Sequence, residues 1–397
     1  MKILFLAPHP FYQERGTPIA VDLLLKTLSA RGDTIELVTF HEGEEKQYAG
    51  VTIHRIPALP WVRNIRPGFS WKKLAGDVLL AFKALRLASR NRFQVVHAVE
   101  ESVFIAMVIR FLFGVPYVFD MDSSMPMQII EKMPALSVAA PFLRFFEALA
   151  ARKSRAVVAV CDALADIARA GGARQVFVLR DISLLPAGYA PLAPPTAAAA
   201  LPEVEHPCLI YIGNLEAYQG IDLMLKSFAA LLKSEPRACL EIIGGNEKTI
   251  AQYRRQCADL GIAPRVRFFG PRPPADMARF FTRADILISP RVKGVNTPMK
   301  IYSYLQSGKP VLATDLPTHT QVLDGATALL AAPEPEAFAA AMLELVRNPA
   351  LGRQLAERAA ALAGEKYSWR AYQHTALQIY QQIENDVKRM SADAQRH

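Results

Sequence analysis

Basic residues surround the start of a predicted helix in the second half of the chain. Thr297 is a suitable N-cap and Pro298 suits the first helical position, while Gly308 and Pro310 would end the helix. A helix N-terminus offers unpaired N–H groups and a partial positive charge, which attract phosphate. Three nearby cations could neutralise a diphosphate: Arg291, Lys293 and Lys300. The segment predicts a phosphate site, although an ordinary capped helix with solvated charges would have the same residues.

Acidic and imidazole side chains lie at the ends of two predicted strands in the first half. Asp120 and Asp122 are two residues apart, and alternation along an extended strand would aim both carboxylates the same way. They could accept hydrogen bonds from substrate hydroxyls, or bind Mg²⁺ or Mn²⁺ together with a phosphate. Because the D-x-D pattern is short and common, we predict no metal. His97 ends the other strand, before Glu100, and is either a binding residue or a buried structural histidine.

Length and composition place these residues in a folded protein of two domains. The chain has 397 residues, of which 51% are hydrophobic and 21% charged, a composition that excludes disorder as the main state. No uncharged run approaches the roughly 20 apolar residues of a membrane span. The four cysteines lack metal-ligand spacing, which favours a reducing, cytoplasmic setting.

Both halves alternate short apolar runs with amphipathic stretches, the pattern of parallel sheets covered by helices. In the first half, strands are predicted over 3–7, 34–39, 95–98, 117–119 and 157–160, and helices over 18–30, 72–90, 101–113 and 138–153. In the second half, strands are predicted over 208–212, 239–243, 266–268, 286–289 and 311–313, and helices near 221–233, 247–260, 275–283, 298–306 and 335–347. No G-x-G-x-x-G motif follows the first strand, which argues against a nicotinamide dehydrogenase.

The predicted organisation is α/β, with two Rossmann-like domains that face each other across a cleft. Residues 1–185 form the first domain and residues 207–368 the second, joined by a proline-rich linker over 186–206. A charged amphipathic helix and tail over 369–397 is expected to pack back on the first domain. Ligands of such domains bind at the carboxyl ends of the strands.

The second half resembles glycosyltransferase family 4, retaining enzymes with the two-domain GT-B fold. The resemblance rests on three segments, 284–290 (ADILISP), 297–300 (TPMK) and 307–315 (SGKPVLATD), with support from 211–214, 219–220, 242–245 and 268–270. In the first half, Gly16-Thr17 occupies the place of the family's glycine loop. The match implies a second domain that binds an activated sugar donor through Gly213, Asn214, Gln219, Gly244, Arg291, Lys293, Asn296, Thr297, Lys300 and Ser303.

The chain departs from the family at charged positions. The family's acidic pair falls on Val295 and Ser303, and its diphosphate-binding Arg and Lys fall on Asn214 and Gln219. Its first-domain histidine falls on Asp122, which the resemblance makes the catalytic residue. The acceptor is expected beside it, at Arg15, Gly16, Thr17, His97 and Asp120.

Residues 61–92 form a strongly basic stretch. It has eight Lys and Arg against one Asp, interleaved with aromatic residues. This pattern suits an anionic membrane surface; a solvated helix with buried aromatic side chains would also fit. Although aromatic residues among cations can bind single-stranded nucleic acid, no nucleic-acid module is recognisable, and we predict no nucleic-acid partner.

The sequence therefore predicts a retaining, metal-independent glycosyltransferase, similar to hexosyltransferases, that needs no cofactor. It would move sugar from a nucleotide-sugar donor to a saccharide or lipid-linked acceptor, in the synthesis of cell-surface polysaccharide or glycolipid. The expected setting is the cytoplasm, with contact to the inner face of the membrane. The alternative is a non-catalytic GT-B relative that binds a sugar nucleotide or a partner enzyme.

Overall fold

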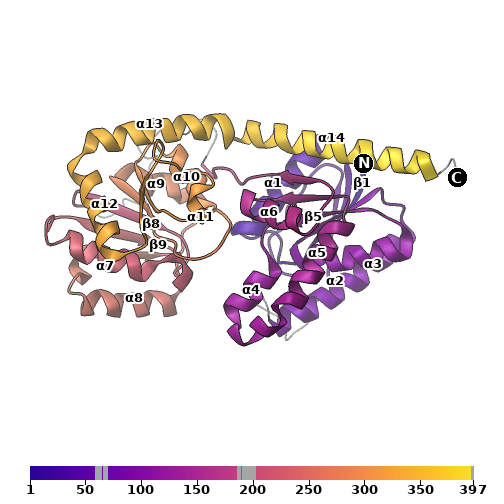
Figure 1. The fold of residues 1–397 in the computed structure, drawn as a ribbon, viewed down its shortest axis with the longest axis horizontal. Helices are drawn as coiled ribbons and strands as arrows, with labels where there is room; N and C mark the ends of the chain where they lie inside the picture. Colours follow the sequence, from indigo (N-terminus) through magenta and orange to yellow (C-terminus); the bar gives the residue numbers. More distant parts are fainter. Residues whose placement is uncertain (59–64, 66–69, 186–188, 190–202, 395–397) are drawn as a thin grey trace. The chain divides into compact units, whose positions relative to one another are not determined.

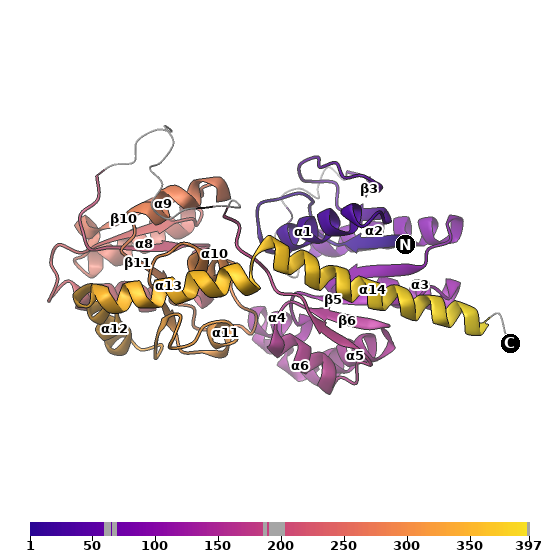
Figure 2. The same ribbon diagram turned by 90° about the horizontal axis from the view of Figure 1, so that it is seen from above.

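The computed structural model describes residues 1–58, 65, 70–185, 189 and 203–394. The chain divides into two compact units (Figure 1, Figure 2): unit 1 comprises Met1–Arg180 and Tyr372–His397, and unit 2 comprises Asp181–Ala371. The chain thus passes between the units twice, close to the predicted boundaries after residues 185 and 368. Most of the predicted linker over 186–206 lies outside the described residues.

Unit 1 is built on a seven-stranded parallel sheet in the order β3-β2-β1-β4-β5-β6-β7. The strands are β1 (Lys2–Ala7), β2 (Thr34–Thr39), β3 (Val51–Arg55), β4 (Val95–Val99), β5 (Tyr117–Met121), β6 (Ala156–Ala159) and β7 (Val176–Val178). The central strands are continuous buried apolar runs, as expected for a sheet covered on both faces. Strand order reverses direction between β1 and β4, which makes their carboxyl ends the switch point where ligands bind in such sheets.

Helices connect the strands of unit 1. They are α1 (Gly16–Ala30), α2 (Trp71–Arg90), α3 (Val103–Phe113), α4 (Met125–Lys132), α5 (Ala140–Lys153) and α6 (Asp162–Ala170), with short 3₁₀ segments η1 (Glu100–Ser102) and η2 (Pro134–Ala139). Ser70 caps α2 by accepting a hydrogen bond from the backbone N–H of Lys73 at 3.2 Å. Gly114 ends α3 in the left-handed conformation that glycine adopts readily.

Unit 2 repeats the plan with a six-stranded parallel sheet in the order β10-β9-β8-β11-β12-β13. The strands are β8 (Cys208–Ile212), β9 (Cys239–Ile243), β10 (Val266–Gly270), β11 (Ile286–Ser289), β12 (Val311–Thr314) and β13 (Leu329–Ala331). The order reverses between β8 and β11, so the switch point of this unit lies at their carboxyl ends.

The helices of unit 2 bury two apolar cores, one against each face of the sheet. They are α7 (Ile221–Leu231), α8 (Glu247–Asp259), α9 (Met277–Arg283), α10 (Lys300–Gln306), α11 (Pro317–Thr320), α12 (Pro335–Arg347) and α13 (Pro349–Lys366), with 3₁₀ segments η3 (Ala217–Gln219), η4 (Ala263–Arg265) and η5 (Pro274–Asp276). Asn246 begins α8 with a capping box, in which its side chain and that of Thr249 each bind the other's backbone N–H.

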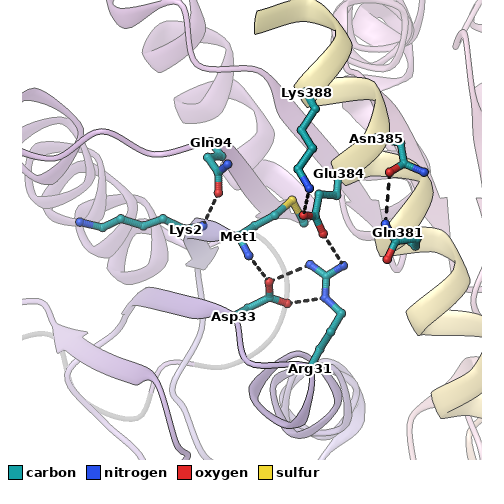
Figure 3. A network of polar contacts seen from close by, with 9 residues as sticks. All are labelled: Met1, Lys2, Arg31, Asp33, Gln94, Gln381, Glu384, Asn385 and Lys388. Atoms are coloured by element: carbon teal, nitrogen blue, oxygen red, sulfur yellow. Dashed lines mark hydrogen bonds and ion pairs between the residues drawn. The ribbon is translucent and has the colours of Figure 1, made fainter. Parts of the chain in front are cut away.

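The last helix, α14 (Trp369–Ala394), belongs to unit 1 from Tyr372 onward. A polar network holds it against β1 and the end of α1 (Figure 3). Arg31 donates to Asp33 at 2.7 Å and to Glu384 of α14 at 3.2 Å. Because the C-terminal segment returns to the N-terminal unit, Arg31 and Glu384, which are 353 positions apart in sequence, pair within one unit.

The structure confirms the two α/β domains and all ten predicted strands. Sequence patterns missed β3, β7 and β13 because the first is half-exposed and the other two have only three residues. The predicted helix over 298–306 begins two residues late, at Lys300, with Met299 rather than Thr297 at its N-cap. Among the described residues, no helix combines the length and apolar character needed to cross a membrane.

Candidate functional site

The switch point of unit 2 brings together residues that follow β8 and β11. Gly213 and Asn214 follow β8, while Arg291 and Lys293 follow β11. Lys300, at the start of α10, reaches the same place, because a side chain at Gly213 would meet Lys300 Nζ at 3.3 Å. The basic residues singled out in the sequence are therefore neighbours at one end of one sheet.

Lys300 is the most unusual residue of this group. Its Nζ is shielded from solvent, lies 3.8 Å from the centroid of the Tyr211 ring, and has no hydrogen-bond partner among the described residues. Burial, with a smaller effect from the charge of Arg291, holds the pKa of Lys300 well below its usual 10.5. A buried ammonium without a hydrogen-bond acceptor is costly, and an anion bound at this place would remove the cost.

Arg291 is held in a fixed position beside Lys300. It is 7% exposed, donates from Nε to the carbonyl of Lys293 at 2.7 Å and from Nη2 to Asn296 Oδ1 at 2.9 Å. Its guanidinium also lies 5.2 Å from the centroid of the Tyr218 ring. Asn296 and the backbone of Lys293 thus orient the guanidinium, whereas the side chain of Lys293 is exposed.

Two glycines permit the close approach of the loops around these cations. Gly220 has φ +74°, and a Cβ there would lie 1.8 Å from the carbonyl oxygen of Pro290. Gly244 has φ +111°, and a Cβ there would lie 2.1 Å from the carbonyl oxygen of Gly213. Any other residue at either position would force the loops apart.

The uncharged residues predicted to bind the donor differ in whether their side chains have hydrogen-bond partners within the protein. The Thr297 hydroxyl does not cap α10. Both this hydroxyl and Gln219 Oε1 are buried and have no hydrogen-bond partner among the described residues. Asn214 donates to the Tyr218 hydroxyl at 3.2 Å. Ser303 Oγ accepts from the backbone N–H of Leu184 at 3.1 Å and so holds the chain where it enters unit 2.

His319, which the sequence reading did not single out, supports this site from behind. Its Nε2 contacts Ser289 Oγ at 2.8 Å and its Nδ1 contacts Thr314 Oγ1 at 3.0 Å. Burial lowers the pKa of His319 to about 3, aided by the charges of Lys300 and Arg291. The imidazole is therefore neutral at physiological pH and joins the ends of β11 and β12. Its role depends on partners five and thirty residues away, which no local motif indicates.

The predicted acceptor residues of unit 1 come from three strands: Arg15, Gly16 and Thr17 follow β1, whereas His97 lies within β4 and Asp120 within β5. Arg15 is the N-cap of α1, directly before Gly16 and Thr17, and its Nη2 reaches the carbonyl of Ile65 at 3.5 Å. Burial lowers the pKa of Arg15. A side chain at Gly16 would meet open space, so this loop leaves room for a ligand.

Asp120, His97 and Tyr380 of the last helix are joined by a series of hydrogen bonds. His97 is fully buried; its Nε2 contacts Asp120 Oδ2 at 2.9 Å and its Nδ1 contacts the hydroxyl of Tyr380 at 2.6 Å. Both ring nitrogens are thus engaged within the protein, and Asp120, at 14% exposure, is the member open to solvent. Asp122 follows the end of β5 and is half-buried.

Replacing Tyr380 with phenylalanine tests how much the hydrogen bond between Tyr380 and His97 contributes to stability. The variant keeps the aromatic ring but leaves Nδ1 of His97 buried without its partner, which costs about 1–3 kcal/mol of unfolding free energy. Urea unfolding followed by circular dichroism measures the change. Stability within about 0.5 kcal/mol of the wild type would show that this hydrogen bond does not hold α14 in place.

The sequence patterns did not indicate a half-buried charge cluster at the switch point of unit 1. Lys73 pairs with Glu101. Burial and the charge of Glu101 raise the pKa of Asp77 to about 8. Glu100 has φ +49° and accepts from Ser123 Oγ at 2.8 Å. A pocket at this place is lined by Glu100, Glu101, Val103, Phe104, Phe119, Ser123, Met125, Gln128 and Glu147. Its carboxylates suit hydroxyl-bearing ligands.

Each half of the chain matches a known family model. A "Glycosyl transferase 4-like domain" model matches residues 15–180, and a "Glycosyl transferases group 1" model matches residues 206–348. Among curated proteins, D-inositol 3-phosphate glycosyltransferase of Corynebacterium glutamicum (strain R) is 28% identical over 47% of this chain and 45% of its own. Phosphatidyl-myo-inositol mannosyltransferase of Mycobacterium leprae (strain TN) is 26% identical over 44% and 46%. The matched region thus spans less than half of these relatives.

Solved structures share the fold over almost the whole chain. Sucrose-phosphate synthase from Thermosynechococcus elongatus has a TM-score of 0.74 at 16% identity and covers 97% of this chain and 99% of its own. Anabaena Alr3699/HepE in complex with UDP has a TM-score of 0.72 at 16% identity, with coverage of 97% and 100%. WaaG, a glycosyltransferase involved in lipopolysaccharide biosynthesis, has a TM-score of 0.69 at 14% identity. At these identities the likeness establishes the GT-B fold.

Proposed function

The chain belongs to the glycosyltransferases with a 4-like first domain and a group 1 second domain, and from this premise we propose that it transfers a sugar from a nucleoside diphosphate donor to a hydroxyl acceptor. Lys300 is the main support for the donor site: among the described residues its shielded ammonium has no hydrogen-bond partner, and it lies next to the oriented guanidinium of Arg291. Two adjacent cations at the switch point match the charge of a diphosphate. The UDP complex of HepE supports this choice of donor class.

The two cations would act on the leaving group. Transfer breaks the bond between the anomeric carbon of the sugar and the diphosphate oxygen, and negative charge develops on that oxygen. Hydrogen bonds hold Arg291 in place and Lys300 packs against Tyr211, so both would stabilise this charge with little reorganisation. The acceptor hydroxyl loses its proton to the departing phosphate oxygen as the new glycosidic bond forms. Retention of the anomeric configuration is part of the proposal.

Unit 1 would bind the acceptor. In this proposal Asp122 is the catalytic residue and accepts a hydrogen bond from a sugar hydroxyl near the reacting carbon. Asp120 is oriented by His97, and Arg15, Gly16 and Thr17 line the loop after β1. The names of the curated relatives, which act on inositol phosphate and phosphatidyl-myo-inositol, support a polyol, saccharide or lipid-linked acceptor. We place the reaction in cell-surface polysaccharide or glycolipid synthesis, at an anionic membrane surface.

Turnover of sugar nucleotides tests the proposal. The full chain is incubated with UDP-, GDP-, ADP- and TDP-sugars and a panel of saccharide and lipid acceptors, and release of free nucleoside diphosphate is measured. Acceptor-dependent release from one donor is the expected result. Binding of a donor without release under any acceptor would instead favour a non-catalytic relative, a candidate suggested by Val295 and Ser303 at the positions of the family's acidic pair. Absence of both binding and release would overturn the proposal.

A further inference from the structure

Large apolar side chains are exposed on one part of unit 1. Thirteen of the fifteen that are exposed among the described residues lie between positions 71 and 145, and the other two are on α14. Unit 2 has none among its described residues. The most exposed are Trp71 at 78%, Phe111 at 87% and Val138 at 89%. Since such side chains are normally buried when they are clustered, this concentration indicates an interaction surface.

The helices that carry these residues are neighbours. α3 packs against both α2 and α5, and α5 packs against α4 and η2 (Figure 1). Their exposed apolar residues therefore form one surface, here called the α2–α5 face: Trp71, Leu74, Val78, Phe82, Val108, Phe111, Leu112, Phe113, Met127, Met133, Val138, Phe142 and Phe145. The basic stretch 61–92 contributes only α2 to it; residues 59–64 and 66–69 lie outside the described part of the chain.

On three of these helices, α2, α3 and α5, the exposed charged side chains have one sign. Helices α2, α3 and α5 contain two acidic residues, Asp77 and Glu147; the first is half-buried and the second is 6% exposed. Their exposed charged side chains are all basic: Lys72, Arg86, Arg90, Arg110, Arg144, Arg152 and Lys153. Aromatic and aliphatic residues beside Lys and Arg are typical of segments that lie in a membrane interface. Each cation near an anionic lipid surface adds about 1 kcal/mol.

We infer that the α2–α5 face docks on a lipid bilayer that contains anionic lipids, with Phe111, Leu112 and Phe142 inserted among the lipids and the basic residues against the headgroups. The inference deepens the membrane part of the proposed function and rests on it. The pocket of unit 1 adjoins this face, because Phe104 of α3 and Met125 and Gln128 of α4 line it. A bilayer held there would supply an acceptor attached to a lipid directly to the pocket.

Sedimentation of the full chain with vesicles tests the inference. Vesicles of phosphatidylcholine mixed with phosphatidylglycerol are compared with vesicles of phosphatidylcholine alone, at low and high salt. We expect the wild type to bind the anionic vesicles and to release them as salt rises. The triple variant Phe111→Ser, Leu112→Ser, Phe142→Ser should lose at least tenfold in affinity. Its thermal unfolding should match the wild type, because the three side chains are exposed.

A matched control replaces the two large apolar residues that, within the described part of the chain, are exposed outside the face. This variant, Leu377→Ser with Met390→Ser, should bind vesicles like the wild type. The inference is overturned if the wild type ignores anionic vesicles, or if the triple variant binds them as well as the wild type. It is also overturned if neither protein binds vesicles and only the wild type forms a dimer, because the face would then bind a second copy of the chain. UDP binding, measured separately, reports on the proposed donor site and should be the same in all three proteins.

Discussion

Replacing Lys300 with methionine is expected to weaken the binding of a nucleoside diphosphate by about 30-fold or more, while making the unliganded protein more stable. Removal of one partner from a buried charge pair costs about 2–5 kcal/mol, and each 1.4 kcal/mol is a factor of ten. Methionine fills a similar volume against Tyr211 without a charge to desolvate. Calorimetric titration with UDP and GDP measures the affinity, and urea unfolding measures the stability.

The gain in stability should depend on pH in one direction. The pKa of Lys300 is lower in the folded protein than its usual 10.5, so between these two values the unfolded chain binds more protons. Stability of the wild type therefore rises with pH in this window. The advantage of Lys300→Met, about 1 kcal/mol or more, should be fully present below the lowered pKa and disappear as the pH approaches 10.5.

Lys226→Met is the matched control, because Lys226 is an exposed lysine on α7 of the same unit. It should leave nucleotide affinity unchanged and shift stability by less than about 0.5 kcal/mol. Equal nucleotide affinity in Lys300→Met and the wild type would contradict the placement of the diphosphate. A loss of stability in Lys300→Met would show that the ammonium has a partner within the folded protein.

The second large effect is expected at Gly220. Alanine there must adopt φ +74°, and its Cβ would lie 1.8 Å from the carbonyl oxygen of Pro290. The left-handed backbone alone costs roughly 1–2 kcal/mol, and the clash must also displace the loop that holds Arg291. We expect Gly220→Ala to lower the unfolding free energy by about 3 kcal/mol or more, with loss of nucleotide binding.

Gly364→Ala provides the comparison for this variant. Gly364 is an exposed residue in α13 with open space around the position of a Cβ. Alanine should stabilise the helix by about 0.5–1 kcal/mol. Urea unfolding of both variants should therefore give changes of opposite sign. A stability loss below about 1 kcal/mol in Gly220→Ala would mean that the loops of β8 and β11 can move apart at little cost.

Much of the fold could be predicted because buried parallel strands appear in the sequence as short runs of apolar residues. Strands β2, β8, β9 and β11 have the bounds that their sequences predict. Three of the four edge strands, β3, β7 and β13, were missed because they are brief or half-exposed, so that their pattern resembles that of a loop. The predicted helix start near position 298 was wrong. N-cap preferences consider only the residue type at the helix start, whereas in the folded protein the Thr297 hydroxyl is buried and does not cap the helix.

The donor site was more predictable than the acceptor site. Lys300 and Arg291 lie within ten residues of each other, so local charge indicated their role. The surroundings of His97 depend on Tyr380, 283 residues away, and no sequence pattern links the two. Ser303 was expected to face the donor, whereas its hydroxyl accepts from Leu184. Long-range partners of this kind become visible only when the chain is folded.

Lys300 is where unit 2 is proposed to bind the diphosphate of a sugar nucleotide. Calorimetric titration of the wild type and of Lys300→Met with UDP, GDP, ADP and TDP, and with the corresponding nucleosides, tests it most directly. We expect at least one nucleoside diphosphate to bind the wild type, its nucleoside not to bind, and Lys300→Met to lose the binding. Binding of the nucleoside alone, or equal binding by the two proteins, would contradict it.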